Sequence, residues 1–190
     1  MVSLFKLNEK RIPMVIGSEG ETKKEIEDEL GVKIEIDSHT GEVDIKPNTE
    51  REDFNPLNII IAKKVIKAIN RGFNPNKAIK LKNDEFTLEV INLSSILGKS
   101  RKKLKRIKGR LIGRNGEIRE AIEQYAECYV SIFGKTISVI ADHENLQIAK
   151  KAINMIINGM PHHTVLTYLE NMYTKKQKEQ FKKMYKPDFS

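Results

Sequence analysis

The stretch "LIGRNGEIREAIEQYAECYVSI" at residues 111–132 resembles an earlier part of the same chain. The segment "VIGSEGETKKEIEDELGVKIEI" at residues 15–36 aligns with it without a gap, at an offset of 96 residues. Both stretches contain two glycines three residues apart, namely Gly17 with Gly20 and Gly113 with Gly116. Self-similarity over this length predicts two copies of one structural unit.

A second match extends the repeat beyond the glycines. The segment "IAKKVIKAINRGF" at residues 61–73 pairs with "IAKKAINMIINGM" at residues 148–160, at an offset of 87 residues. In each copy, the apolar spacing predicts a strand, a short helix, a second helix after the glycines, two strands and a long closing helix. The expected strands are residues 3–7, 32–36 and 42–46 in the first copy and 86–93, 128–132 and 136–140 in the second. The predicted order is therefore β-α-α-β-β-α, twice, in the α+β class.

The charge balance favours a polyanionic partner. The 190 residues include 34 Lys and Arg against 26 Asp and Glu, a net charge of +8, which is typical of proteins that bind RNA, DNA or acidic lipid headgroups. The single cysteine, Cys128, excludes an intramolecular disulfide and a Cys-rich zinc site, and it fits a reducing compartment. Because no apolar run approaches the roughly 18 residues of a membrane span, we expect no membrane partner and a cytoplasmic location.

The sequence around each glycine pair indicates the fold more specifically than the two glycines do. Each pair follows an aliphatic residue and an isoleucine, joins helix to helix, and lies in the same β-α-α-β-β-α unit. This arrangement resembles the type I KH domain, in which a G-x-x-G loop binds the backbone of about four unpaired nucleotides. Such a turn at a helix N-terminus presents backbone N–H groups to a phosphate, and its lack of side chains allows close approach. We expect two tandem type I KH modules followed by a C-terminal helical extension.

The second copy has the composition of an RNA-binding surface. Residues 99–127 contain ten Lys and Arg against four Glu. Many of these cations lie on an expected helix with only a thin apolar stripe. The groove beside the turn is expected to have an apolar floor, with base edges read near the following strand. The predicted RNA-binding residues are Lys108, Arg110, Ile112, Gly113, Arg114, Asn115, Gly116, Ile118, Arg119, Tyr129 and Lys135.

The first copy has the opposite charge. Residues 17–31 contain two lysines against six acidic residues, and Glu19 lies between the two glycines. Because carboxylates repel phosphate, the favoured interpretation here is that the glycines only let two helices pack at a sharp angle. That explanation remains the alternative for the second copy. Both copies also depart from the usual KH pattern at Lys23 and Arg119, where many members carry an aliphatic residue, and this predicts a narrower or more polar groove.

The residues after the second copy indicate one particular family of KH proteins. The stretch "INGMPHHTVLTYLENM" at residues 157–172 places a proline and two histidines at the start of an expected short helix. A degraded first turn, an intact second turn and this ending resemble the archaeal partner-of-Nob-one family, also called Dim-two. The resemblance implies a role in small ribosomal subunit assembly and rRNA 3′-end maturation, through binding of the single-stranded 3′ region of the small-subunit rRNA by the second module. It also implies two protein partners, the Nob-one endonuclease and the alpha subunit of translation initiation factor two.

The sequence contains no pattern that indicates catalysis. There is no P-loop and no nucleophile with its base, and His162 and His163 have no further ligands at metal spacing. We expect a non-catalytic RNA-binding protein without a metal or cofactor, with modules at residues 1–73 and 81–160 and an extension at 161–190. Two alternatives stay open: a protein–protein adaptor with incidental RNA contact, and a KH subunit of an RNA-degrading complex.

Overall fold

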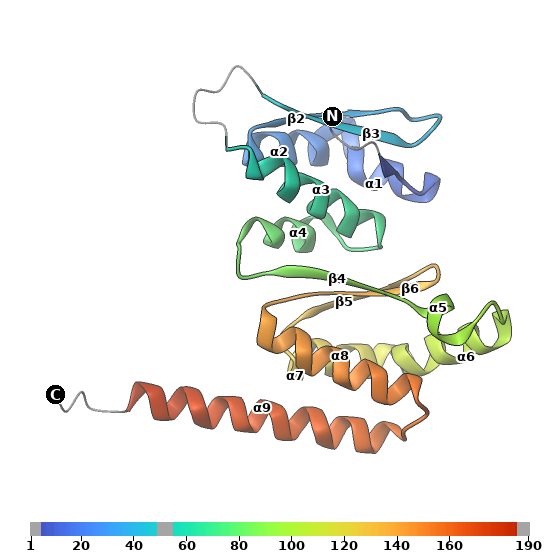
Figure 1. Cartoon of the computed structure of the whole chain (residues 1–190), viewed down its shortest axis with the longest axis vertical. Helices are drawn as coiled ribbons and strands as arrows, with labels where there is room; N and C mark the ends of the chain where they lie inside the picture. Colours follow the sequence, from blue (N-terminus) through green and yellow to red (C-terminus); the bar gives the residue numbers. More distant parts are fainter. Residues whose placement is uncertain (1–4, 49–54, 186–190) are drawn as a thin grey trace. The chain divides into compact units, whose positions relative to one another are not determined.

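A computed structural model describes residues 5–48 and 55–185 (Figure 1). The first copy has the expected order of strands and helices, and the second copy adds one short helix, α5 (Leu93–Leu97), directly after its first strand. This confirms the α+β class with two KH-type repeats. The backbone contacts divide the chain into two compact units, Met1–Ile91 with Ser131–Ile140 and Asn92–Val130 with Ala141–Ser190. The module boundaries proposed from the sequence stay predictions.

The first unit begins with a three-stranded antiparallel sheet in the order β1-β3-β2. The register pairs Ile34 with Ile45, and both side chains are buried. Their neighbours Lys33 and Glu35 are exposed, which is the alternation of a sheet with one face in the core. The strands are β1 (Phe5–Lys6), β2 (Val32–Ile36) and β3 (Glu42–Pro47).

Asp37 holds the turn between β2 and β3. The backbone N–H groups of Thr40 and His39 donate to Oδ1 of Asp37, at 3.1 and 2.8 Å. These hydrogen bonds, first from Thr40 and then from His39, stabilise the ionised carboxylate and lower the pKa of Asp37 below its ordinary value. An aspartate that accepts from the following backbone is a turn-forming residue, so Asp37 stabilises the turn that joins the two strands.

Helices α2 and α3 pack against strands β2 and β3. They do so through residues at helical spacing, as the sequence predicted: Ile26 and Leu30 of α2 and Val65 and Ile69 of α3 are at most 2% exposed. The helices of this part are α1 (Ile12–Ile16), α2 (Glu21–Leu30) and α3 (Leu57–Asn70), with 3-10 turns at Glu9–Arg11 and Ser18–Gly20.

The sequence analysis did not predict the short helix α4 (Pro75–Ala78) that follows α3. The side chain of Asn74 caps it by accepting from the N–H of Asn76 at 2.9 Å, and the chain continues in a 3-10 turn at Ile79–Lys82. An Asn followed by Pro is a recognised helix start, so the signal was present in the sequence.

The second copy repeats the strand order of the first, as β4-β6-β5. Its strands are β4 (Thr87–Asn92), β5 (Tyr129–Phe133) and β6 (Thr136–Ala141). The helices of the second unit are α5 (Leu93–Leu97), α6 (Arg101–Ile112), α7 (Glu117–Tyr125), α8 (His143–Ile157) and α9 (His162–Met184), with a 3-10 turn at Arg114–Gly116.

One side-chain contact recurs at equivalent positions of the repeat. The carboxylate of Glu27 accepts from the N–H of Ile34 at 2.6 Å, and that of Glu123 accepts from the N–H of Val130 at 2.9 Å. Both members of each pair keep the offset of 96 residues. The contact ties the helix after the glycines to the next strand in both copies, so these two glutamates have a structural role.

The last helix is longer than the sequence analysis expected. Instead of a short helix after Pro161, α9 is a single helix of 23 residues. The segment contains neither glycine nor proline, so nothing in it ends the helix. Its first half packs against α7 and α8, with Val165 and Leu169 fully buried. No helix within residues 5–48 and 55–185, α9 included, is both long and apolar enough to cross a membrane.

Candidate nucleic-acid interface

The two glycine turns have nearly the same backbone. Gly17 and Gly113 have φ values of 78° and 77°, and the second glycine of each pair is left-handed. Glu19 and Asn115 are also left-handed, with φ values of 50° and 54°. Asparagine tolerates this conformation better than glutamate does. The copies therefore differ in the side chains that the turns carry rather than in backbone shape.

The protein's own packing requires the first glycine of each turn. A Cβ at Gly113 would lie 2.6 Å from Cγ1 and 2.8 Å from the backbone nitrogen of Ile118. A Cβ at Gly17 would lie 2.4 Å from Oγ1 of Thr22. Close approach of a ligand was the explanation expected for Gly113, and helix packing was the one favoured for Gly17. At Gly113 and Gly17 the following helix already approaches that closely, so the fold alone demands glycine there.

The second turn leads into the uncapped start of α7. Gly116 is the N-cap residue, and no described side chain caps the helix. The N–H of Glu117 donates to the carbonyl oxygen of Arg114 in the 3-10 turn, and the start of α7 carries the positive end of the helix dipole. The side chains of Arg114 and Asn115 are exposed beside this helix start. Glu117 and Glu120 also lie in the first turn of α7, where they compete with a bound anion.

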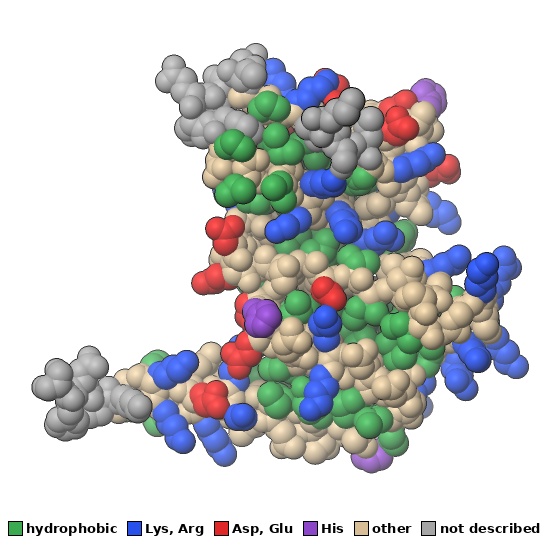
Figure 2. Space-filling model, in the orientation of Figure 1, with side chains coloured by type: hydrophobic (Ala, Val, Ile, Leu, Met, Phe, Trp, Pro, Cys, Tyr) green, Lys and Arg blue, Asp and Glu red, His purple; other side chains and the backbone are tan. Residues whose placement is uncertain are grey.

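Helix α6 carries most of the positive charge. Leu104, Ile107 and Leu111 form its buried stripe, at the spacing that the sequence predicted. The rest of its surface is largely cationic, and Figure 2 shows Lys and Arg side chains gathered over this helix. Its exposed cations are Arg101, Lys102, Lys103, Lys105 and Arg106.

The two isoleucines of the predicted groove differ in solvent exposure. The side chain of Ile112 is 37% exposed, whereas Ile118 is only 3% exposed because it packs under the turn. Tyr129 is half-buried at the start of β5, and Lys108 is half-buried on α6. Lys135 is exposed in the turn between β5 and β6. Ile112 is therefore the apolar side chain that the turn presents to solvent.

Two arginines of the predicted set bind the protein itself. Arg110 donates from Nη1 to the carbonyl oxygen of Ile156 at 2.9 Å and from Nη2 to that of Met160. Ile156 lies in the last turn of α8, where its carbonyl oxygen also accepts from the N–H of Gly159 at 3.1 Å, and Met160 follows the end of the helix. Arg119 forms an ion pair with Glu120 at 3.0 Å. Both cations already have partners, so the exposed cation of the turn is Arg114.

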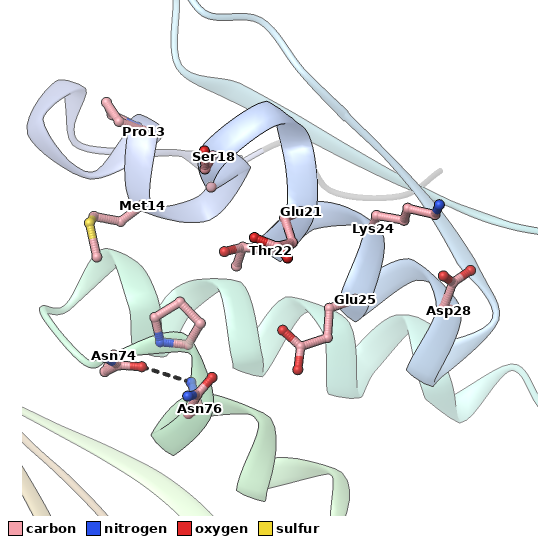
Figure 3. A pocket seen from close by; sticks show the side chains of 12 residues that line it. Pro13, Met14, Ser18, Glu21, Thr22, Lys24, Glu25, Asp28, Asn74 and Asn76 are labelled. Atoms are coloured by element: carbon pink, nitrogen blue, oxygen red, sulfur yellow. Dashed lines mark hydrogen bonds between the residues drawn. The ribbon is translucent and has the colours of Figure 1, made fainter.

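An acidic hollow of about 770 Å³ lies beside the first turn (Figure 3). It is lined by Ser18 of the turn and by three carboxylates of α2, those of Glu21, Glu25 and Asp28. Lys24 is the only cation among the described residues that line it. Figure 3 shows Glu25 between α2 and the start of α4. A phosphate would meet repulsion here, although the backbone of the turn matches that of the second copy.

Models of known protein families match both copies. The model described as eukaryotic type KH-domain (KH-domain type I) matches residues 87–174, and the KH domain model matches residues 2–52. A KH domain-containing protein of Methanocaldococcus jannaschii is 38% identical over 180 residues, which cover 95% of this chain and 78% of that protein. The crystal structure of Dim2p from Pyrococcus horikoshii is 42% identical and has a TM-score of 0.82, covering 90% of this chain and 99% of that one. The chain belongs to the archaeal Dim2p family.

Two further solved structures have the same fold. One is a complex of a/eIF2alpha, aDim2p and rRNA from Pyrococcus horikoshii, with 40% identity and a TM-score of 0.84, covering 92% of this chain and 95% of that one. The other is a protein of unknown function from Aeropyrum pernix, with 35% identity and a TM-score of 0.87, covering 97% and 98%. Membership of the Dim2p family places the chain among RNA-binding ribosome-assembly factors.

One surface of this Dim2p-type chain was not among the predicted site residues. The stretch "KKQKEQFKKMY" at residues 175–185 mixes lysines with two aromatic residues, and it forms the exposed end of α9. That mixture was a signal for nucleic-acid binding. Across residues 5–48 and 55–185, the structure groups no three His, Cys, Asp or Glu side chains that could hold a metal ion.

Proposed function

We propose that the second copy binds the single-stranded 3′ region of small-subunit rRNA during assembly of the small ribosomal subunit, without catalysing a reaction. The observation that carries this proposal is the pair of turns with one backbone, of which only the second carries an arginine and follows a strongly cationic helix. Arg114 and Asn115 lie exposed between the cationic α6 and the start of α7. The corresponding Ser18 and Glu19 lie beside an acidic hollow. The rRNA in the Pyrococcus horikoshii aDim2p complex supports the assignment of RNA as the ligand.

The geometry suggests a division of work within the second copy. A backbone phosphate binds at the first N–H groups of α7, next to the guanidinium of Arg114. The neighbouring bases lie over Ile112, which is exposed, and their edges face the start of β5 at Tyr129. The exposed cations of α6 attract the strand over a longer range and contribute no sequence preference.

The proposal includes 3′-end maturation of the rRNA, in the cytoplasm, and two protein partners. The alpha subunit of translation initiation factor two is supported by the complex in which a/eIF2alpha accompanies aDim2p. The Nob-one endonuclease is supported by the family resemblance alone. The acidic hollow beside Ser18 favours a basic protein surface over RNA as the ligand of the first copy. An adaptor role of the first copy is thus compatible with RNA binding by the second.

The test is a double substitution in each turn. Arg114→Asp with Asn115→Asp places carboxylates where the phosphate binds, and we expect a loss on the order of 2 to 4 kcal/mol in RNA-binding free energy. Aspartate tolerates the left-handed conformation at position 115, so the melting temperature should barely change. Fluorescence anisotropy with a single-stranded oligonucleotide of the rRNA 3′ end measures the affinity.

The matched control is Ser18→Asp with Glu19→Asp in the first turn. Because that turn already has acidic surroundings, the control should leave RNA affinity nearly unchanged. An equal or larger loss from the control than from the second-turn variant would show that RNA is not bound at the second turn. Unchanged affinity in both variants would exclude both turns.

A further inference from the structure

The end of α9 is uncovered. The buried residues of this helix, Val165 and Leu169, lie in its first half, and every described residue after Lys176 is exposed. Figure 1 shows this end of α9 running beyond α8. A helix of eight further residues projects about 12 Å past its last contact. Isolated helices of that length are marginal in water, so the free end depends on a firm anchor.

Two contacts anchor α9 just before its free end. Nζ of Lys176 donates to Oδ1 of Asn145 at 2.9 Å and also pairs with the carboxylate of Glu127. The side chain of Lys176 is 14% exposed and that of Glu127 is 40% exposed, so these charge-assisted contacts are partly shielded from water. The rings of Tyr125 and Tyr173 meet edge to face, with centroids 5.9 Å apart. The anchor fixes the direction in which the free end projects.

The free end exposes two aromatic rings. Phe181 is 57% exposed and Tyr185 is 71% exposed, and their rings stack with centroids 4.4 Å apart. An aromatic pair four residues apart stabilises a helix by only about 0.2 to 0.5 kcal/mol. Helix stability therefore explains neither the exposure of these rings nor the lysines around them. Stacked, solvent-facing rings are platforms on which unpaired bases bind.

Lysines share the face of these rings. From residue 175 to residue 185 the chain has five lysines and one glutamate. At about 100° per residue, Lys178, Phe181, Lys182 and Tyr185 fall within about 100° of one another around the helix axis. Within the described part of the chain, no ion pair or hydrogen bond engages the ammonium groups of Lys178 and Lys182. Lys183 lies about 100° further round than Lys182.

We propose that this face of α9 is a second contact for the same RNA strand, in which an unpaired base stacks on the Phe181 and Tyr185 rings while Lys178 and Lys182 bind the adjoining phosphates. It rests on the proposed function, because it needs a strand already held by the second copy. A single-stranded polyanion matches both the rings and the lysines of one face. A membrane surface would need a broader apolar face than these two rings provide.

The experiment compares two single-stranded RNAs that share the rRNA 3′-end sequence. One has about 6 nucleotides, near the number that a KH groove binds, and the other about 20. Phe181→Leu with Tyr185→Leu keeps apolar, helix-forming side chains but removes the rings. We expect it to weaken binding of the long RNA roughly tenfold, the loss of about one stacked base, and to leave the short RNA unchanged.

Adjacent lysines provide the matched control. Lys182→Gln should reduce the salt slope for the long RNA by about 0.7, the value of one phosphate contact. Lys183→Gln removes the same charge from another face and should leave the slope unchanged. Equal effects of the two substitutions, or parental affinity for the long RNA in the Leu double variant, would overturn the proposal. Circular dichroism verifies that α9 stays helical.

The short RNA separates the two proposals. If the parent protein binds it and Arg114→Asp with Asn115→Asp abolishes that binding, the proposed function holds whatever α9 does. If the parent protein does not bind it, the proposed function fails. A tenfold loss on the long RNA in the Leu double variant would then show a contact at α9 that does not depend on the second copy, and this would overturn the proposal of a second contact for a strand held there.

Discussion

Single residues show which features of the glycine turns belong to the fold and which to the ligand. The φ values of Gly17 and Gly113 agree within 1°, and both positions lack room for a Cβ. These glycines therefore indicate that the turn is formed, whether or not it binds RNA. Arg114 and Asn115 have no such structural constraint, so they carry the difference in function.

A comparison of two glycines tests the structural requirement at Gly113. Gly98 has a φ of 72° with an extended ψ of -173° and open space where a Cβ would point, so Gly98→Ala should cost only the backbone strain of that conformation, about 1 to 3 kcal/mol. Gly113→Ala adds a clash with the backbone and side chain of Ile118, and it should cost about 1 to 3 kcal/mol more. Urea unfolding measures both free energies. Equal losses would show that the clash at Gly113 relaxes freely.

At the scale of elements, an arginine side chain in each copy donates hydrogen bonds to backbone carbonyl groups at the end of the closing helix. Arg11 donates from Nε to the carbonyl oxygen of Ile69 and from Nη2 to that of Phe73, both at 2.8 Å. Arg110 donates to Ile156 and Met160, which follow Ile69 and Phe73 at the offset of 87 residues. The arginines themselves are 99 residues apart. The two copies thus satisfy the same carbonyls from different places in the chain.

Arg110 and Arg114 should separate stability from RNA binding. Arg110→Met keeps an apolar stem but removes the two side-chain hydrogen bonds to the carbonyl oxygens of Ile156 and Met160, and it should lower the unfolding free energy by about 1 to 3 kcal/mol. Arg114→Met should leave the unfolding free energy within about 0.5 kcal/mol of the parent, while it weakens RNA binding. Paired unfolding curves and anisotropy titrations measure the two effects. A larger loss of affinity than of stability in Arg110→Met would restore Arg110 to the RNA-binding surface.

At the scale of the whole molecule, the sequence predicted those features that depend on local residue spacing or on the internal repeat. The alignment of residues 15–36 with 111–132 predicted the element order, and the spacing of Leu104, Ile107 and Leu111 predicted the buried stripe of α6. Contacts between distant residues were not predictable in this way. Arg110 stands among other cations in the sequence, and only the fold brings it to a carbonyl oxygen 46 residues away.

The sequence predicted a helical extension over residues 161–190, with a short helix after Pro161. It did not predict that the extension is one continuous helix. Continuation to Met184 follows from the absence of a helix breaker and from the anchor at Lys176, whose partners Glu127 and Asn145 are far away in the chain. The structure was needed to show that Phe181 and Tyr185 are exposed, because the sequence does not say which part of the helix packs against the rest of the unit.

The whole chain should bind unpaired RNA with a strong dependence on salt. A KH groove engages about four nucleotides, and each neutralised phosphate of a single strand contributes about −0.7 to the slope of log affinity against log salt. For the short RNA we therefore expect a slope near −2.8, measured by anisotropy titrations between about 50 and 200 mM salt. A blunt duplex of the same length should bind more weakly, because its bases are paired and cannot lie over Ile112. Equal affinity for the duplex and the single strand would reject a groove for unpaired bases, and a slope near zero would reject phosphate contacts at Arg114 and the start of α7.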